Sequence, residues 1–388
     1  MTATGTPAPG TRQRDLRSPL RFADYPLVGA TLLLAAFGLA VNYAATWRHL
    51  EFDGEDPAFY LRRQAVFVAV GVVTMVAVAL VDYRFYRYVA RQGYIAILIL
   101  LALVLVVGTE VNGARAWFSY GSFQFQPSEF GKVVVIVALG AFLSRFDGHV
   151  GLDGFVTAIA IVALPMGLVF LQPDLGTMLV YMAIAMGTLL VAGARMLHIG
   201  FATLILIIGA GSILVADEVI GVDLLSDTQE SRLTAFVDRD SVDEDTRFNL
   251  DQSETAIGAG GLTGRGFLEG TQTGLDWVPE QETDFIFTAV AEEFGFLGAG
   301  ALLAVYAFLL FRIWLTARLS ADLFGTLAAV GVLSMFGFQI FQNVGMTMGI
   351  TPVTGLPLPF LSHGGSSTVA AFAAVGLVLN VRARRYAP

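Results

Sequence analysis

The chain has 388 residues, of which 55% are apolar and only 14% are charged, and its mean hydropathy is +0.69. A soluble domain is typically about a quarter charged residues, so this composition excludes an ordinary soluble protein. The absence of cysteine excludes disulfides, a thiol nucleophile and thiolate metal sites, and four histidines argue against a histidine-rich metal centre. The formal net charge of −9 argues against nucleic-acid binding, which requires a basic surface.

Ten apolar runs have the character of membrane-spanning helices, because about 20 apolar residues as a helix cross a hydrocarbon core about 30 Å thick. They lie at residues 24–46, 64–82, 92–109, 129–146, 153–171, 175–193, 198–216, 285–312, 322–345 and 366–381. The alternating strands of a membrane barrel are absent, and no signal-peptide cleavage site follows the first run. The sequence therefore predicts an all-α polytopic membrane protein with about ten transmembrane helices. It divides into a basic N-terminal tail (1–23), a ten-helix membrane domain (24–382) and a short C-terminal tail (383–388).

Arginines fall mainly on one side of the predicted membrane. With the N-terminus inside, fourteen arginines lie in inner segments, whereas the short outer loops hold four. Positively charged loops face the cytoplasm in such proteins, and ten spans return the chain to the side on which it began. Both termini are therefore predicted to be cytoplasmic.

One long extracytoplasmic loop, residues 217–284, is predicted between the seventh and eighth helices. It holds seventeen acidic residues against four arginines, a net charge of −13, which leaves +4 on the rest of the chain. Loops of this length are either functional or disordered. The acidic stretch 238–245 is predicted to be a solvated edge, and 252–284, where glycines alternate with apolar residues, to be ordered.

The first group of candidate site residues lies before and at the start of the fourth predicted span. Arg115 and Trp117 belong to the preceding outer loop, and Pro127 suits the first position of a helix. Glu129 and Lys132 are three residues apart, so they share a helix face and can pair. Ionisable residues at the edge of a span are functional candidates, although a purely local ion pair fits this spacing equally well.

Two aspartates stand at the outer ends of later spans. Asp174 lies in a short turn before the sixth span, and Asp284 is the last charge before the apolar start of the eighth. Capping of a helix N-terminus would explain either position. Glu292 and Glu293 fall inside the eighth span, where unpaired carboxylates are costly, so they require partners or an aqueous cavity.

Carboxylates and cations at one membrane edge suit general-base chemistry on a substrate that carries phosphate, and they suit a cation or proton pathway equally. The glycine-rich stretch 258–266 lacks the strand and helix context of a dinucleotide site, and no Walker motif is present. Ser362 and His363 are adjacent, but the G-x-S-x-G elbow of a hydrolase is absent. The Pro- and Gly-rich segment 349–359 is too apolar for a linker and is predicted to be re-entrant.

Seven segments, in order along the chain, resemble motifs of the SEDS proteins, the RodA, FtsW and SpoVE polymerases of bacterial cell-wall synthesis. They are residues 113–117, 126–132, 172–177, 252–266, 270–272, 279–287 and 355–367. Segment 343–355 resembles the elongation type, RodA, more closely than the division type, FtsW. The resemblance implies a peptidoglycan glycosyltransferase that polymerises lipid II during cell-wall elongation and shape maintenance. It would lie in the bacterial plasma membrane with its active site on the extracytoplasmic side.

The resemblance also implies roles for single residues. Asp284 matches an aspartate that is essential in the family, and we expect it to be the general base for the acceptor sugar hydroxyl, with inversion at the donor's anomeric carbon. The residues expected to line the cavity or bind the diphosphate and sugar are Glu129, Lys132, Asp174, Arg115, Trp117, Arg265 and His363. His363 is a departure, because the family pattern S-Y-G-G-S-S has tyrosine there, and histidine adds a charge option near neutral pH.

The expected partners are lipid II, the lipid bilayer and a class B penicillin-binding protein, since so few residues follow the last span that cross-linking must come from a separate transpeptidase. Family members can depend on a divalent cation, and clustered carboxylates with a diphosphate would accommodate Mg²⁺ or Mn²⁺; no metal ligands are assigned. The alternatives are a lipid II flippase or other transporter, a noncatalytic scaffold for a penicillin-binding protein, and a division-type polymerase.

Overall fold

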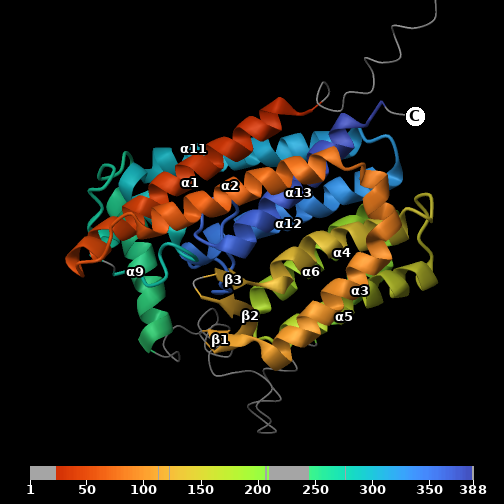
Figure 1. The fold of residues 1–388 in the computed structure, drawn as a ribbon, viewed down its shortest axis with the longest axis horizontal. Helices are drawn as coiled ribbons and strands as arrows, with labels where there is room; N and C mark the ends of the chain where they lie inside the picture. The colour runs from red at the N-terminus through yellow and green to blue at the C-terminus, as the bar shows by residue number, and fades with distance from the viewer. Residues whose placement is uncertain are drawn as a thin grey trace, which may run out of the picture.

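The computed structural model describes residues 23–111, 113–121, 123–205, 208, 244–275 and 277–386. Within these residues the chain forms a bundle of long helices with one small sheet at its side (Figure 1). Most of the predicted basic tail and most of the acidic stretch 238–245 lie outside the described residues.

The described part of the chain is mostly helical. Its helices are α1 (Tyr25–Phe52), α2 (Phe59–Leu80), α3 (Tyr83–Val107), α4 (Pro127–Leu143), α5 (Leu152–Phe170), α6 (Leu175–Val191), Met196–Ile205, α9 (Glu244–Gly260), α10 (Thr271–Gly274), α11 (Ile286–Arg318), α12 (Leu323–Thr347) and α13 (Gly365–Ala383). Seven of them, α1, α2, α3, α5, α11, α12 and α13, are long and apolar enough to cross a membrane. The prediction of a polytopic helical membrane protein is thus confirmed.

Nine of the ten predicted spans coincide with helices α1 to α6 and α11 to α13. The seventh, 198–216, falls on the shorter helix Met196–Ile205 and continues beyond the described residues. The third helix begins earlier than predicted, at Tyr83, because Asp82 caps it by accepting a hydrogen bond from the Arg84 amide.

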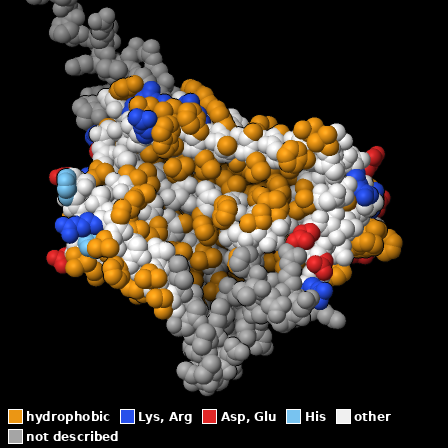
Figure 2. Space-filling model, turned by 180° about the vertical axis from the view of Figure 1, so that it is seen from behind, with side chains coloured by type: hydrophobic (Ala, Val, Ile, Leu, Met, Phe, Trp, Pro, Cys, Tyr) orange, Lys and Arg blue, Asp and Glu red, His pale blue; other side chains and the backbone are white. Residues whose placement is uncertain are grey.

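The bundle has a buried centre and an apolar exterior. Helix α13 is buried along most of its length and packs against α2, α12 and α4. Gly71 of α2 permits the close approach, since a Cβ there would collide with the ring of Phe372. Helices α2 and α3 leave many large apolar side chains exposed. The opposite face, seen in Figure 2, also carries hydrophobic side chains over much of its middle. This is the surface that a lipid bilayer requires.

Helix α11 is interrupted near its start. Gly295 has a φ of 66° and a ψ of −167°, which is not helical. A Cβ at Gly295 would meet the backbone of Thr263 and Gly264, and a side chain disfavours a positive φ as well. The glycine-rich stretch after α9 therefore lies directly against the break in α11.

A three-stranded antiparallel sheet, which was not predicted, precedes α4. It consists of β1 (Thr109–Val111), β2 (Ala114–Tyr120) and β3 (Phe123–Phe125), in that order. The strands are short and lie between two apolar spans, so they left little period-two pattern to detect in the sequence.

A buried ionic cluster joins three helices at the opposite end of the bundle from the sheet. Asp24 caps α1 through the Leu27 amide, and its Oδ1 lies 2.7 Å from Arg312 Nη2 of α11. Its Oδ2 lies 3.7 Å from Arg382 Nε of α13. The Asp24 side chain has no exposed surface. Burying its charge without a partner would be costly, and the two arginines are those partners.

Candidate active site

The site is built around the irregular segment 348–364 between α12 and α13. This segment is buried at Leu356, Leu358, Phe360 and Leu361 although it has no helix or strand of its own. Its backbone carbonyls must therefore find donors inside the protein. Side chains of the surrounding helices supply them: Asn42 to Leu361, Gln64 to Ser362, Tyr306 to Pro359, Gln342 to Pro352 and Asn343 to Leu356. The apolar loop predicted to be re-entrant is thus held from four helices.

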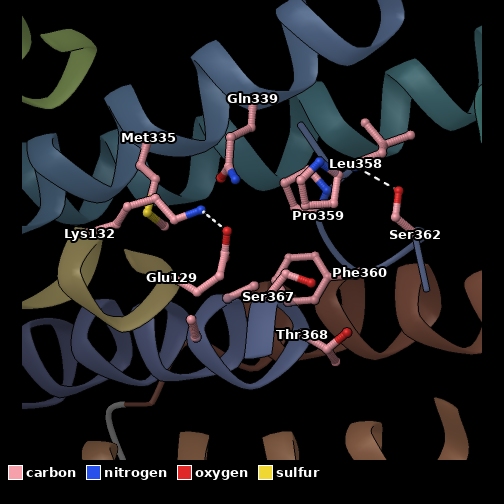
Figure 3. Close-up of a pocket in the computed structure, with 13 residues that line it drawn as sticks. Glu129, Lys132, Met335, Gln339, Leu358, Pro359, Phe360, Ser362, Ser367 and Thr368 are labelled. Atoms are coloured by element: carbon pink, nitrogen blue, oxygen red, sulfur yellow. Dashed lines mark hydrogen bonds and ion pairs between the residues drawn. The ribbon is translucent and has the colours of Figure 1, made fainter. Parts of the chain in front are cut away.

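A small pocket lies between this loop and helices α4, α12 and α13 (Figure 3). Glu129 and Lys132 enter it from α4, and Gln339 points toward it from α12. The Lys132 ammonium lies 2.7 Å from the Glu129 carboxylate, and both side chains are at most 4% exposed. Pro127 occupies the start of α4 as predicted, and the three-residue spacing brings the two charges together. The predicted pair is therefore real, and it lines a cavity.

Asp174 connects α6 to the start of α4. Its Oδ1 accepts from the Thr177 amide at 2.9 Å, which caps α6, and its Oδ2 accepts from Gln126 Nε2 at 3.2 Å. The capping interpretation is confirmed. The second bond adds that Asp174 fixes the residue just before the helix that carries Glu129.

Asp284 is half-buried in the turn that leads into α11. The cap position of α11 is Phe285, so Asp284 lies one residue before it. Its amide donates to the Glu280 carbonyl at 3.0 Å, and its carbonyl accepts from Asn343 Nδ2 at 2.8 Å. Asp284 is not among the residues that line the pocket of Figure 3. The loop 348–364 connects the two, because Asn343 also bonds Leu356.

His363 lies at the end of the same loop, outside the helices. Its amide donates to the Glu282 carbonyl at 2.7 Å, and its ring packs edge-on against Tyr60 with centroids 5.0 Å apart. Burial, with a smaller effect of the Arg63 charge, lowers the pKa of His363 to about 4. The imidazole is therefore neutral at physiological pH.

Three predicted substrate contacts lie outside the pocket. Arg115 is exposed on β2 and pairs loosely with Glu110 at 3.5 Å, while Trp117 is half-buried in the same strand opposite Thr109. Arg265 is exposed, and its Nη1 donates to Thr271 Oγ1 at 2.9 Å. None of the three is among the residues that line the pocket of Glu129 and Lys132.

Both oxygens of Glu292 accept hydrogen bonds, whereas Glu293 accepts one through Oε1 and its Oε2 is buried without a hydrogen-bond partner among the described residues. The Glu292 carboxylate accepts backbone hydrogen bonds from Thr271, Gln272 and Thr273 at 2.7–2.8 Å, at the start of α10. Glu293 Oε1 accepts from the Leu268 amide at 3.1 Å. Both carboxylates thus anchor the loop after α9 onto the break in α11.

Three polar residues of the site were not predicted: Gln126, Gln339 and Asn343. Gln339 and Asn343 are amides one turn apart within the apolar helix α12. Polar residues inside spans are rare and usually functional, so that signal was present in the sequence.

The chain is similar to known proteins along almost its whole length. Residues 26–387 match the family model FTSW_RODA_SPOVE, described as "Cell cycle protein". Stage V sporulation protein E of Bacillus subtilis (strain 168) is 38% identical over 370 residues, covering 94% of this chain and 98% of the relative. Peptidoglycan glycosyltransferase MrdB of Escherichia coli (strain K12) is 34% identical over 366 residues, covering 94% and 96%.

A solved structure described as "Structural coordination of polymerization and crosslinking by a peptidoglycan synthase complex" contains a chain of similar fold. The TM-score is 0.76 at 33% identity, with 94% of this chain and 99% of that chain covered. Sequence and fold therefore agree over the same residues. The chain belongs to the FtsW/RodA/SpoVE family of polytopic membrane proteins.

Proposed function

We propose that this protein polymerises lipid II into glycan strands at the outer mouth of the bundle, with Asp284 as the general base. The chain is a peptidoglycan glycosyltransferase by its full-length similarity to relatives of that name. The observation that carries the residue assignment is the placement of Asp284. It lies at the start of α11 and is joined through Asn343 to the loop that lines the Glu129–Lys132 pocket.

In the proposed reaction the acceptor sugar hydroxyl attacks the anomeric carbon of the donor. A carbon–oxygen bond forms to the acceptor, the bond from the anomeric carbon to the diphosphate breaks, and undecaprenyl diphosphate leaves. Asp284 takes the hydroxyl proton, and a base placed opposite the leaving group gives inversion. The diphosphate is already an activated leaving group, so the step needs no nucleotide.

The other residues have supporting roles in this proposal. Lys132 offers positive charge to the substrate, and its pairing with Glu129 makes its burial tolerable. Asp174 holds the start of α4 in place. Arg115, Trp117 and Arg265 are exposed or half-buried beyond the pocket, where they are available to the diphosphate and sugars.

The test is polymerisation of lipid II by the purified protein together with its transpeptidase. Asp284→Ala and Asp284→Asn should abolish glycan strand formation while the unfolding temperature in detergent stays near that of the wild type. Glu280→Gln is the matched control, because Glu280 is an exposed carboxylate in the same turn, and it should retain activity. Polymerisation at the wild-type rate by Asp284→Ala would exclude the assigned role.

A transport function is the main alternative. Two carboxylates inside a span, Glu292 and Glu293, favoured transport. Both accept backbone hydrogen bonds from the loop after α9. Such bonds suit a fixed structural anchor better than a transport site that binds and releases its substrate. Movement of labelled lipid II across vesicles without polymer formation would support transport. Normal wall growth with Asp284→Ala would support a noncatalytic scaffold instead.

We further propose a class B penicillin-binding protein as the partner and both termini in the cytoplasm. The similar chain in a peptidoglycan synthase complex supports a partner, and the arginine distribution supports the orientation. Because the chain has no cysteine, a single Thr4→Cys substitution gives a clean test. A membrane-impermeant maleimide should label it only after the cells are opened.

We also propose that the protein is of the elongation subtype and that it depends on a divalent cation. Depletion of an elongation polymerase should produce rounded cells, whereas depletion of a division polymerase should produce filaments. Among the described residues no three carboxylate or imidazole groups are placed to hold a metal ion, so we derive no catalytic step through one. Chelation followed by Mg²⁺ or Mn²⁺ addition in the polymerisation assay tests the requirement.

A further inference from the structure

Asn343 occupies an unusual position between two segments of the site. It lies on α12 with no exposed surface. The two hydrogens of its Nδ2 go to different parts of the chain: one bond reaches the Asp284 carbonyl and the other the Leu356 carbonyl, each at 2.8 Å. One amide group therefore links the turn before α11 to the loop 348–364.

A second bond ties the same two segments together. The His363 amide, at the other end of the loop, donates to the Glu282 carbonyl at 2.7 Å. The turn that carries Asp284 is thus fixed to the loop at two points, one on each side of the stretch Pro357–Phe360. That stretch lines the pocket of Glu129 and Lys132 (Figure 3), so a continuous set of contacts joins Asp284 to the pocket.

The chemistry of Asn343 is specific to this link. Both acceptors are carbonyl oxygens, so the position needs a group that donates twice. A carboxylate of the same shape would present oxygens to both carbonyls, and alanine would leave both acceptors unsatisfied in a buried place. The neighbouring Gln342 is also buried and donates to the Pro352 carbonyl at 2.8 Å, but it makes no such bond to the turn of Asp284.

We infer that Asn343 is a positioning residue for the glycosyl transfer: it holds the backbone of Asp284 at a fixed place relative to the Glu129–Lys132 pocket. The inference rests on the proposed role of Asp284 as the base. Asn343 does not touch the substrate in this scheme. Its loss should therefore misplace the base and lower kcat more than it weakens substrate binding, since an error of about 1 Å in a reacting group can cost about a hundredfold in rate.

The experiment compares Asn343→Ala, Asn343→Asp and Asn343→Ser with Gln342→Ala, in the complex of the full chain with its transpeptidase. We expect kcat of Asn343→Ala and Asn343→Asp to fall about tenfold to a hundredfold, with KM for lipid II changing much less. Gln342→Ala should keep kcat near the wild-type value, although it too removes a buried donor to the loop. Asn343→Ser retains one donor and should give an intermediate kcat.

Hydrogen exchange gives a second measurement that does not depend on activity. Peptides covering 280–286 should exchange faster in Asn343→Ala than in Gln342→Ala. Equal kcat and equal exchange in these two variants would overturn the inference while leaving the proposed function intact. Wild-type activity of Asp284→Ala would overturn both, because there would be no base to position. If Asn343→Ala fails to fold, the test uses Asn343→Ser. A wild-type kcat and unchanged hydrogen exchange in Asn343→Ser would overturn the inference.

Discussion

Lys132 Nζ lies 2.7 Å from Glu129 Oε1 in a part of α4 where neither side chain has more than 4% of its surface exposed. Removing one partner of a buried ion pair leaves an uncompensated charge and costs about 3–5 kcal/mol. Lys132→Met should therefore lower the free energy of unfolding by about this amount. Denaturant unfolding in detergent measures it.

The double variant Glu129→Gln/Lys132→Met separates stability from activity. It removes both charges, so most of the lost stability should return, because neutral replacements of a buried pair are often tolerated. Polymerisation should stay low if Lys132 serves the substrate. Recovery of full polymerisation in the double variant would show that the pair is structural only.

Glu292 offers a test of the anchored loop. Its carboxylate accepts from three successive amides at the start of α10, and hydrogen bonds to charged groups contribute about 1.5–3 kcal/mol each. Glu292→Gln turns an NH₂ group toward these donors and should loosen the loop. Trypsin should then cut after Arg265 faster than in the wild type. Glu269→Gln, an exposed carboxylate of the same loop, should leave the cleavage rate unchanged.

Two glycines of α1 test how closely the loop 348–364 packs against this helix. A Cβ on Gly38 would collide with the Phe360 carbonyl and approach Leu361 Cα to 2.9 Å, whereas a Cβ on Gly29 meets nothing within 4 Å. Gly38→Ala should cost about 1–3 kcal/mol of stability through overpacking and reduce polymerisation. Gly29→Ala should be neutral or stabilising by up to about 1 kcal/mol. The unfolding temperatures of the two variants measure this difference. Equal unfolding temperatures would contradict the prediction.

His363 should make stability depend on pH. Its pKa in the folded protein is lowered to about 4, from 6.5, so the unfolded chain takes up the proton first as the pH falls. The stability that is present above pH 6.5 is then lost progressively down to about pH 4. His363→Tyr should flatten this part of the unfolding profile, whereas His149→Asn, at an exposed position, should not. An unchanged profile in His363→Tyr would contradict the assignment.

Much of the fold could be predicted from the sequence because membrane spans follow directly from apolar length. The Glu129–Lys132 pair and the Asp174 cap are also local, since helical spacing and turn chemistry determine them. Both were confirmed with their partners in contact.

The contacts that assemble the site could not be predicted in this way. Asn343 and Leu356 are separated by 13 residues, but Asn42 reaches Leu361 across 319 and Gln64 reaches Ser362 across 298. Nothing in the local pattern states which amide donates to which carbonyl in an irregular segment. A similar limit applies to the small sheet at Arg115, because β1 has only three residues and β2 buries only Ala116, so neither strand alternates clearly between buried and exposed positions.

The Asp24 cluster has a mechanical consequence for the whole bundle. Asp24, Arg312 and Arg382 tie α1, α11 and α13 together at one end, while Asp284 and the start of α13 lie at the other. Because Asp24 pairs with Arg312 and faces Arg382 at the same time, none of these three helices can shift at this end without straining the contacts of the other two. The break at Gly295 lies between this tie and Asp284, so the two ends of α11 do not move as one rigid rod.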